Sequence, residues 1–139
     1  MTSHDNDDRI RTGIPEMDGE HAVQIELLRA LEQALAAADQ TKALEIIGQL
    51  QDYTSLHFAS EQLLMRLHGY PAYYAHEQEH ANLLDELRTL RGTIEAAQPG
   101  SHHLIAKAIT GWLVGHIQSS DQSLAAFLTE ARAEARESK

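Results

Sequence analysis

Five histidines and two carboxylates lie at metal-ligand spacings along four stretches of this sequence: His21; His57 and Glu61; His76 and His80; and His116 and Asp121. Residues four apart lie on one face of a helix, about one turn from each other, so the second and third stretches can each supply two ligands to one cluster. His116 and Asp121 lie five apart. Such a pair must either straddle the metal or use a local π-turn, which is common at functional sites.

These side chains can complete the coordination of two metal ions. Each of the five imidazoles can form one bond, and each of the two carboxylates can bridge both metals. With an oxide or hydroxide bridge, one metal becomes six-coordinate and the other five-coordinate, with one position open for a small diatomic molecule. A nitrogen-rich set of ligands without thiolates suits iron, copper or zinc better than magnesium or calcium.

Each histidine could instead be an ordinary hydrogen-bonded residue of the core, and for His21 alone we would prefer that interpretation. Five imidazoles on core stripes are harder to explain in this way, because unpaired buried polar groups cost about 1–3 kcal/mol each. A metal ion supplies the missing partner for all five. The sequence therefore predicts a metal centre.

The surrounding sequence has the periodicity of four amphipathic helices, with core positions alternately three and four residues apart. No stretch has a strand pattern, and the connections are short, so the predicted fold is an all-α, up-down-up-down four-helix bundle. The helices are predicted over approximately residues 18–38, 42–68, 71–97 and 101–134. The residues that mark their ends are Asp18 as the first N-cap, Gly69 as the end of the second helix, Pro71 as the start of the third and Ser101 as the fourth N-cap.

This topology predicts that the candidate ligands meet. Helices one and three begin at the end of the bundle where helices two and four finish. His21, His76 and His80 lie near predicted helix starts, whereas the other four candidates lie in the later halves of their helices. All seven are therefore expected at one end of the bundle and at comparable height.

The bulk properties exclude several classes of function. The chain has 139 residues, which suits one domain, and no cysteine, which excludes disulfides, iron–sulfur clusters and cysteine nucleophiles. The net charge of −10 argues against nucleic acid and anionic membranes as partners. The N-terminus lacks the apolar segment of a signal peptide, and no apolar run approaches the roughly 20 residues that span a bilayer. We therefore expect a cytoplasmic protein.

Four motifs in this chain resemble those of the hemerythrin family, in its single-domain bacterial form, bacteriohemerythrin. The resemblance extends from Gly13 to Leu128, and the motifs together are highly specific. They are Met17-Asp18-Gly19-Glu20-His21; His57-Phe58-Ala59-Ser60-Glu61 with Met65, Gly69 and Tyr70; His76-Glu77-Gln78-Glu79-His80; and Trp112-Leu113-Val114-Gly115-His116-Ile117 with Asp121.

The resemblance implies two non-haem iron ions with an oxo or hydroxo bridge, and dioxygen that binds end-on at the open iron. The ligands that it implies by position are His76, His80 and His116 on the six-coordinate iron, His21 and His57 on the five-coordinate iron, and Glu61 and Asp121 as bridges.

The resemblance also implies an oxygen pocket beside the open iron. For any one of its residues, ordinary core packing is the simpler interpretation, but both roles are compatible because a dry apolar wall protects a bound oxygen species from protons. The implied lining residues are Phe58, Met65, Trp112, Leu113 and Ile117.

Gln24 departs from the family pattern, which usually has an apolar residue three positions after the first histidine. The periodicity places Gln24 on the core stripe, one turn from His21. We expect its amide to reach toward the open iron and to hydrogen-bond a bound oxygen species. The alternative is that Gln24 swings outward and Ile25 takes its place in the pocket.

The other four histidines are not expected to be ligands. His68 lies two turns beyond Glu61 and is expected to be a helix-end residue. His4 lies in the predicted tail, and His102 and His103 lie in the first turn of the fourth predicted helix.

The leading interpretation is a binding protein rather than an enzyme, which carries, stores or locally delivers dioxygen. One alternative is a domain that senses oxygen, nitric oxide or redox state and acts through a partner. The other is a di-iron enzyme with peroxidase-like or nitric-oxide-scavenging activity, which Gln24 keeps open. We expect a monomer or a weak homo-oligomer, with a disordered acidic tail at residues 1–9, a hemerythrin-like domain at 10–134 and a C-terminal tail at 135–139.

Overall fold

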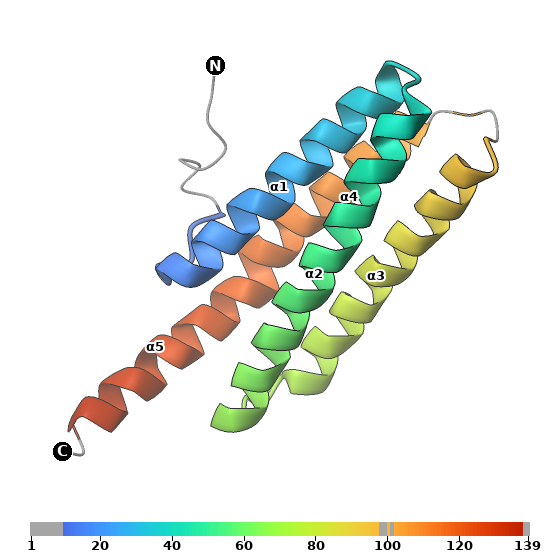
Figure 1. The fold of residues 1–139 in the computed structure, drawn as a ribbon. Helices are drawn as coiled ribbons and strands as arrows, with labels where there is room; N and C mark the ends of the chain where they lie inside the picture. The colour runs from blue at the N-terminus through green and yellow to red at the C-terminus, as the bar shows by residue number, and fades with distance from the viewer. Residues whose placement is uncertain (1–9, 98–99, 101, 138–139) are drawn as a thin grey trace.

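The computed structural model describes residues 10–97, 100 and 102–137. Within these residues the chain is almost entirely helical and has no strand, and its helices form the predicted up-down-up-down four-helix bundle (Figure 1). The predicted tail at residues 1–9 and the predicted cap Ser101 lie outside this part of the chain. None of the described helices is long and apolar enough to cross a membrane.

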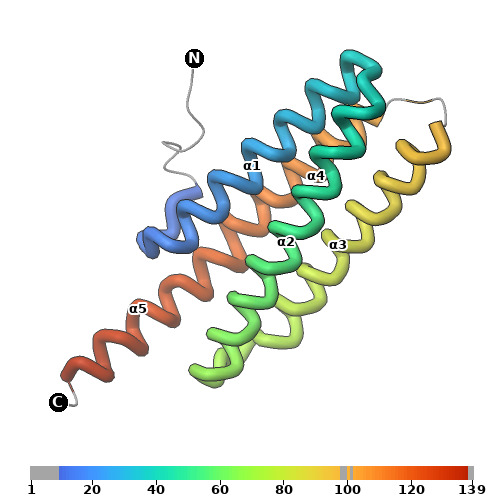
Figure 2. Tube along the Cα trace, viewed as in Figure 1, coloured from blue at the N-terminus to red at the C-terminus, as the bar shows by residue number. Residues whose placement is uncertain are grey.

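The first three helices are regular, whereas the fourth runs continuously through three segments. The regular helices are α1 (Pro15–Ala36), α2 (Gln40–His68) and α3 (Tyr73–Glu95). The fourth consists of α4 (His102–His116), the π-helical turn η3 (Ile117–Asp121) and α5 (Gln122–Glu137). Figure 2 shows α5 continuing the course of α4 and projecting beyond the start of α1. Its last residue, Glu137, lies three residues past the predicted helix end at 134.

The helices pack in a ring, in which α1 contacts α2 and α4, and α3 contacts α2 and, more sparsely, α4. Short turns with specific capping residues produce this arrangement. The side chain of Asp39 caps α2 by accepting a hydrogen bond from the backbone N–H of Lys42 at 3.1 Å. Gly69 ends α2 as predicted, because its φ of 65° lies in the left-handed region that favours glycine.

The predicted starts of the first and third helices were wrong by two to three residues. Pro15 opens α1, where its fixed φ and missing N–H suit the first turn, so Asp18 is not the N-cap. The carboxylate of Asp18 instead accepts hydrogen bonds from the backbone N–H and the hydroxyl of Thr12, at 2.8 and 2.7 Å. It therefore ties the preceding segment to the helix. Pro71 precedes α3, which begins at Tyr73.

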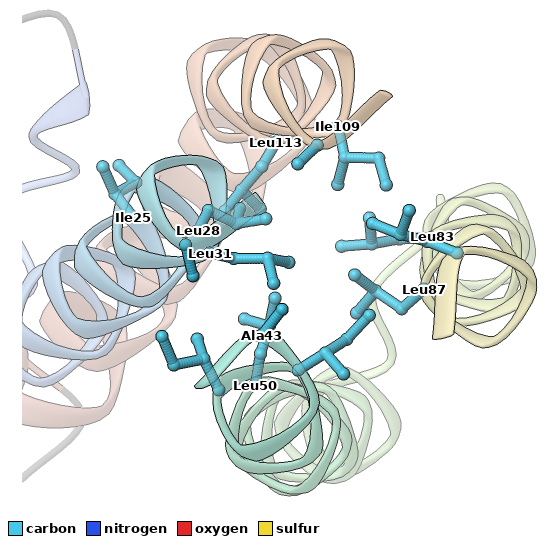
Figure 3. Close-up of a cluster of buried hydrophobic side chains, with 14 of the residues drawn as sticks. Ile25, Leu28, Leu31, Ala43, Leu50, Leu83, Leu87, Ile109 and Leu113 are labelled. Atoms are coloured by element: carbon cyan, nitrogen blue, oxygen red, sulfur yellow. The ribbon is translucent and has the colours of Figure 1, made fainter. Parts of the chain in front are cut away.

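Two clusters of buried apolar side chains lie on either side of the predicted ligands along the bundle. On α1, His21 lies between Met17 of the smaller cluster and Ile25 of the larger one. On the fourth helix, the smaller cluster begins at Leu124, just after the ligand positions. Figure 3 shows the larger cluster, to which all four helices contribute. The polar ligands are therefore enclosed between two apolar layers.

Leu31 tests the larger cluster, because its side chain is fully buried. We expect Leu31→Ala to lower the free energy of unfolding of the metal-free protein by about 2–5 kcal/mol, through lost burial and the cavity that remains. Urea denaturation followed by circular dichroism measures this change. Leu56→Ala is the matched control, because Leu56 is 71% exposed and its loss is expected to change stability by less than about 0.5 kcal/mol. Equal losses in the two variants would contradict the core described here.

Candidate metal centre

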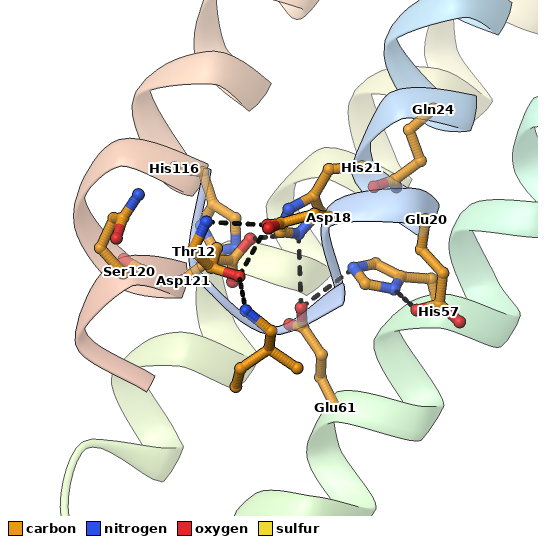
Figure 4. Close-up of polar contacts among 12 residues, drawn as sticks. Thr12, Asp18, Glu20, His21, Gln24, His57, Glu61, His116, Ser120 and Asp121 are labelled. Carbon is orange, nitrogen blue, oxygen red and sulfur yellow. Dashed lines mark hydrogen bonds and ion pairs between the residues drawn. The ribbon is translucent and has the colours of Figure 1, made fainter. Parts of the chain in front are cut away.

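All seven predicted ligands meet at one level of the bundle, and each is at most 3% exposed. Figure 4 shows side chains from α1, α2 and the fourth helix converging on this point. Potential ligand atoms within 4.8 Å of one another fall into two groups that share one carboxylate. The groups are Glu61, His76, His80, His116 and Asp121; and His21, His57 and Glu61.

Glu61 directs its two carboxylate oxygens to different histidines. Its Oε1 lies 3.2 Å from Nε2 of His76 and 3.1 Å from Nε2 of His80. Its Oε2 lies 2.9 Å from Nε2 of His57 and 3.7 Å from Nε2 of His21. One carboxylate therefore faces two sets of imidazoles, with one oxygen for each.

Asp121 repeats this division from the opposite helix. Its Oδ1 lies 3.0 Å from Nε2 of His76 and 3.2 Å from Nε2 of His116, and its Oδ2 lies 3.0 Å from Nε2 of His21. Both carboxylates therefore lie between a three-histidine set (His76, His80 and His116) and a two-histidine set (His21 and His57). This is the placement that a bridging carboxylate needs.

The π-helical turn η3 brings Asp121 into this position. Residues five apart lie roughly 140° apart on an α-helix, but the wider π-turn brings them onto the same face. His116 ends α4, Asp121 ends η3, and both are buried within the cluster. Of the two local geometries that the spacing left open, the structure has the π-turn.

Three of the imidazoles contact, through their Nδ1 atoms, residues that the sequence did not identify as part of the site. Nδ1 of His57 pairs with the carboxylate of Glu20, and Nδ1 of His116 lies 2.6 Å from Oε1 of Glu79. Nδ1 of His80 lies 3.0 Å from Oε1 of Gln62. Such partners fix the orientation of a ligating histidine and raise its basicity.

The outer carboxylates follow a pattern that the sequence does contain. Glu20 directly precedes His21, and Glu79 directly precedes His80. Neighbouring residues point about 100° apart around a helix, so each glutamate reaches a histidine of another helix instead of the one beside it. Ser120 adds a second donor to Glu79, since its hydroxyl lies 2.8 and 3.0 Å from the two carboxylate oxygens.

The charges within the cluster determine where its protons lie when no metal is bound. Burial lowers the pKa of His21 and of His76, but the carboxylates of Asp121 and Glu61 outweigh it and raise each pKa to about 9. Burial likewise opposes ionisation of Glu61 and Asp121, yet the surrounding histidines hold the pKa of both carboxyls below the usual range. Against the effect of burial, Glu61 raises the pKa of His57 as well. Protonated imidazoles thus face the two carboxylates in the metal-free protein, and metal ions would replace their charge.

Hydrogen bonding within the protein leaves much of this cluster unsatisfied. Among the described residues, the buried side-chain atoms without a hydrogen-bond partner are Nδ1 and Nε2 of His21, Nε2 of His57, His80 and His116, Oε2 of Glu61, Oδ1 and Oδ2 of Asp121, and Oε1 of Gln24. All but the last belong to the seven candidates, most of whose contacts with one another are ion pairs without hydrogen-bond geometry. Metal ions would bind the Nε2 atoms and the carboxylate oxygens together, so the residues present fit a two-metal centre.

Four of the residues predicted to line an oxygen pocket are buried in one apolar cluster: Ile25, Phe58, Leu113 and Ile117. The ring of Phe58 stacks on His80, with centroids 3.6 Å apart and planes 3° apart. These side chains form an apolar wall on one side of the ligand cluster.

Met65 and Trp112 lie apart from that wall. Met65 is buried in the smaller cluster, on the other side of the ligands, with Met17 and Leu124. Trp112 is 36% exposed, stacks on the ring of His116 with centroids 5.1 Å apart, and lines a surface groove of about 710 Å³ between α3 and α4. The structure therefore divides the six predicted apolar residues between three environments.

The side chain of Gln24 is fully buried, so the alternative in which it swings outward is wrong. Its Nε2 donates a hydrogen bond to Oγ1 of Thr54 at 3.2 Å, from α1 to α2. Ile25 is buried as well, at 2% exposure. Both side chains therefore fit into the interior.

The remaining described histidines stay outside the cluster. His68 is the last residue of α2 and is exposed, as predicted for a helix-end residue. His102 and His103 lie in the first turn of α4 and are partly exposed. His4 lies outside the described residues.

Comparisons with known proteins agree with this arrangement. The family model described as "Hemerythrin HHE cation binding domain" matches residues 12–128. A bacteriohemerythrin of Stenotrophomonas maltophilia (strain R551-3) is 32% identical over 118 residues, which are 85% of this chain and 76% of that protein. A hemerythrin of Phascolopsis gouldii is 31% identical over 75 residues, which are 54% and 55% of the two chains.

The fold also matches a solved structure. A crystal structure of a leucine-to-phenylalanine mutant aligns with a TM-score of 0.77 at 24% sequence identity, over 84% of this chain and 89% of the other. At that identity the match concerns the fold alone. The family match covers most of the domain and includes all seven candidate ligands, and we conclude that the chain belongs to the hemerythrin family.

Proposed function

We propose that this protein binds dioxygen reversibly at a di-iron centre, for carriage, storage or local delivery. The observation that carries the proposal is the unequal division of histidines around two shared carboxylates. Three histidines lie on one side of Glu61 and Asp121, and two lie on the other. A metal in the two-histidine set would have fewer protein ligands and therefore a position for an exogenous ligand.

The proposed ligands are His76, His80 and His116 for one iron, His21 and His57 for the other, and Glu61 and Asp121 as bridges. Iron bound there would supply reversible cycling between the ferrous and ferric states, together with the open position. The imidazole-rich, thiolate-free ligand set supports iron. The names of the relatives, bacteriohemerythrin and hemerythrin, point to the same type of centre.

Residues around this centre would keep it able to bind dioxygen reversibly. Glu20, Glu79 and Gln62 hold three of the imidazoles in fixed orientations, so that their Nε2 atoms face the centre. The apolar wall that includes Phe58 and Leu113 would exclude water. Water exclusion limits the side reactions that consume a bound oxygen species, which supports reversible binding over turnover.

Visible spectroscopy tests the proposed function. Protein loaded with Fe(II) without oxygen is expected to develop a charge-transfer colour in air and to bleach when oxygen is removed, over repeated cycles. His116→Ala is expected to abolish the colour, because it removes one ligand of the three-histidine set. His68→Ala is the control, because His68 is exposed at the end of α2, and it should behave as the wild type does.

Two results would count against reversible dioxygen binding. A direct and irreversible change to the diferric spectrum in air would favour the alternative of a redox or peroxide-consuming enzyme. Loss of the colour in His68→Ala together with its persistence in His116→Ala would contradict the proposed ligands.

The pH dependence of stability tests the charge balance of the cluster. Folding raises the pKa of His21 and His76 from 6.5 to about 9. Protons therefore stabilise the folded metal-free protein fully below pH 6.5, and this stabilisation is lost as the pH rises through about 9. We expect the melting temperature of the metal-free protein to fall across this window and that of the iron-loaded protein to change much less. A metal-free melting temperature that stays constant from pH 6.5 to 9 would contradict the proposed charge balance.

A further inference from the structure

Gln24 is a fully buried polar residue, and its side-chain amide is only half satisfied. Its Nε2 donates to Oγ1 of Thr54 at 3.2 Å, whereas its Oε1 has no hydrogen-bond partner. Thr54 is itself only 1% exposed. A buried amide oxygen without a partner costs about 1–3 kcal/mol, and an apolar residue in this position would avoid that cost.

The Gln24 amide and the Thr54 hydroxyl form a pair whose free end can be either a hydrogen-bond acceptor or a hydrogen-bond donor. A threonine hydroxyl rotates and can donate or accept, and the two ends of a glutamine amide can exchange places. When Nε2 donates to Thr54, the free end of Gln24 is a carbonyl oxygen. When the amide is turned over, Thr54 donates to the oxygen and the free end is an N–H donor.

The pair lies next to the two-histidine set. Gln24 follows His21 by three residues on α1, and Thr54 precedes His57 by three residues on α2. Residues three apart on a helix are neighbours on one face, so the Gln24–Thr54 hydrogen bond joins the two helices one turn from both imidazoles. Figure 4 shows Gln24 and His21 leaving α1 one turn apart.

This set is the one with fewer protein ligands, and two buried apolar residues lie next to Gln24 and His57 in sequence. Ile25 follows Gln24 and is buried, and Phe58 follows His57 and is buried. Apart from atoms of the seven candidate ligands, Oε1 of Gln24 is the buried side-chain atom left without a hydrogen-bond partner among the described residues.

We propose that Gln24 is a ligand-binding residue, held by Thr54, whose free amide end hydrogen-bonds the small molecule at the open position of the His21–His57 metal. This proposal rests on the proposed function, because it requires a metal in that set. The ligands that it favours are small and polar or charged, such as azide, which accepts a hydrogen bond from the amide N–H. An apolar residue at position 24 could not form a hydrogen bond with such ligands.

Azide binding to the diferric protein is the direct test, measured from the charge-transfer absorption as azide is added. We expect Gln24→Leu to raise the dissociation constant roughly tenfold, the effect of losing one hydrogen bond to a charged ligand. Thr54→Val leaves the amide in place but removes its support, and we expect a smaller rise of about threefold. Thr110→Val is the matched control: it also removes a buried threonine hydroxyl, one that donates to Glu32 at 2.6 Å, and it should leave azide binding unchanged.

A vibrational measurement separates hydrogen bonding from a loosened site. The stretching frequency of bound azide should shift when wild-type protein is moved from H₂O to D₂O, because the amide proton exchanges. The shift should be smaller in Gln24→Leu. The wild-type shift can be measured even if that variant does not fold.

The stability of the metal-free protein gives a third readout. If Gln24 serves the ligand rather than the fold, Gln24→Leu should melt at the same or a higher temperature than the wild type, because it removes an unsatisfied polar group. A lower melting temperature together with unchanged azide affinity would assign Gln24 a structural role and overturn the proposal. Equal solvent shifts in wild type and variant would also overturn it.

These outcomes are distinct from failure of the proposed function. Protein that takes up no iron, or wild-type diferric protein that binds no azide, would contradict the metal centre itself, and with it the role of Gln24. A different result would remove only the role of Gln24. In that case wild-type protein binds azide and dioxygen, and Gln24→Leu binds azide equally well, so the proposed metal centre is supported.

Discussion

The rest of this structure depends on two buried carboxylates that face five imidazoles. Glu61 and Asp121 are each at most 2% exposed, and an ionised carboxylate is costly to bury unless its charge is paired. The histidines supply that pairing as cations when no metal is bound and would supply it as co-ligands when metal is bound. Because each carboxylate divides its oxygens between two sets of histidines, four helices must meet at one level with little freedom to slide.

The apolar layers on either side have a related physical role. They keep water from the polar cluster, which strengthens its electrostatic interactions and makes its unsatisfied atoms more costly. The larger cluster lies toward the turn between α1 and α2, and the smaller one toward the start of α1. Metal binding would give partners to most of the unsatisfied atoms of this enclosed cluster at once. We therefore expect folding and metal binding to be coupled.

The sequence predicts much of this arrangement, because both helical periodicity and metal-ligand spacing are local patterns. The four helices follow from core positions three and four residues apart, and the meeting of the seven candidate ligands follows from the up-down-up-down topology. The helix starts were less accurate, since Asp18 resembles an N-cap but pairs with Thr12 within the first turn. The choice between a π-turn and a straddling pair at Asp121 depends on backbone geometry that a spacing of five residues does not decide.

Contacts between helices were the hardest to predict. Glu20 and Glu79 lie beside predicted ligands in sequence, but each contacts a histidine of another helix, and that requires the relative rotation of the helices. The position of Met65 shows the same limit: the resemblance implies that it lines the oxygen pocket, but only the packing of the helices shows on which side of the ligands it lies. Gln24 could be placed inside or outside from sequence, and the structure places it inside, where its amide donates a hydrogen bond to Thr54.

The division of the two carboxylates between unequal sets of histidines is the central claim, and a crystal structure of the iron-loaded protein with anomalous scattering at the iron edge tests it most directly. We expect two iron peaks bridged by Glu61 and Asp121, one bound by His76, His80 and His116 and the other by His21 and His57. A single iron, or two irons with a carboxylate bound to only one of them, would contradict it.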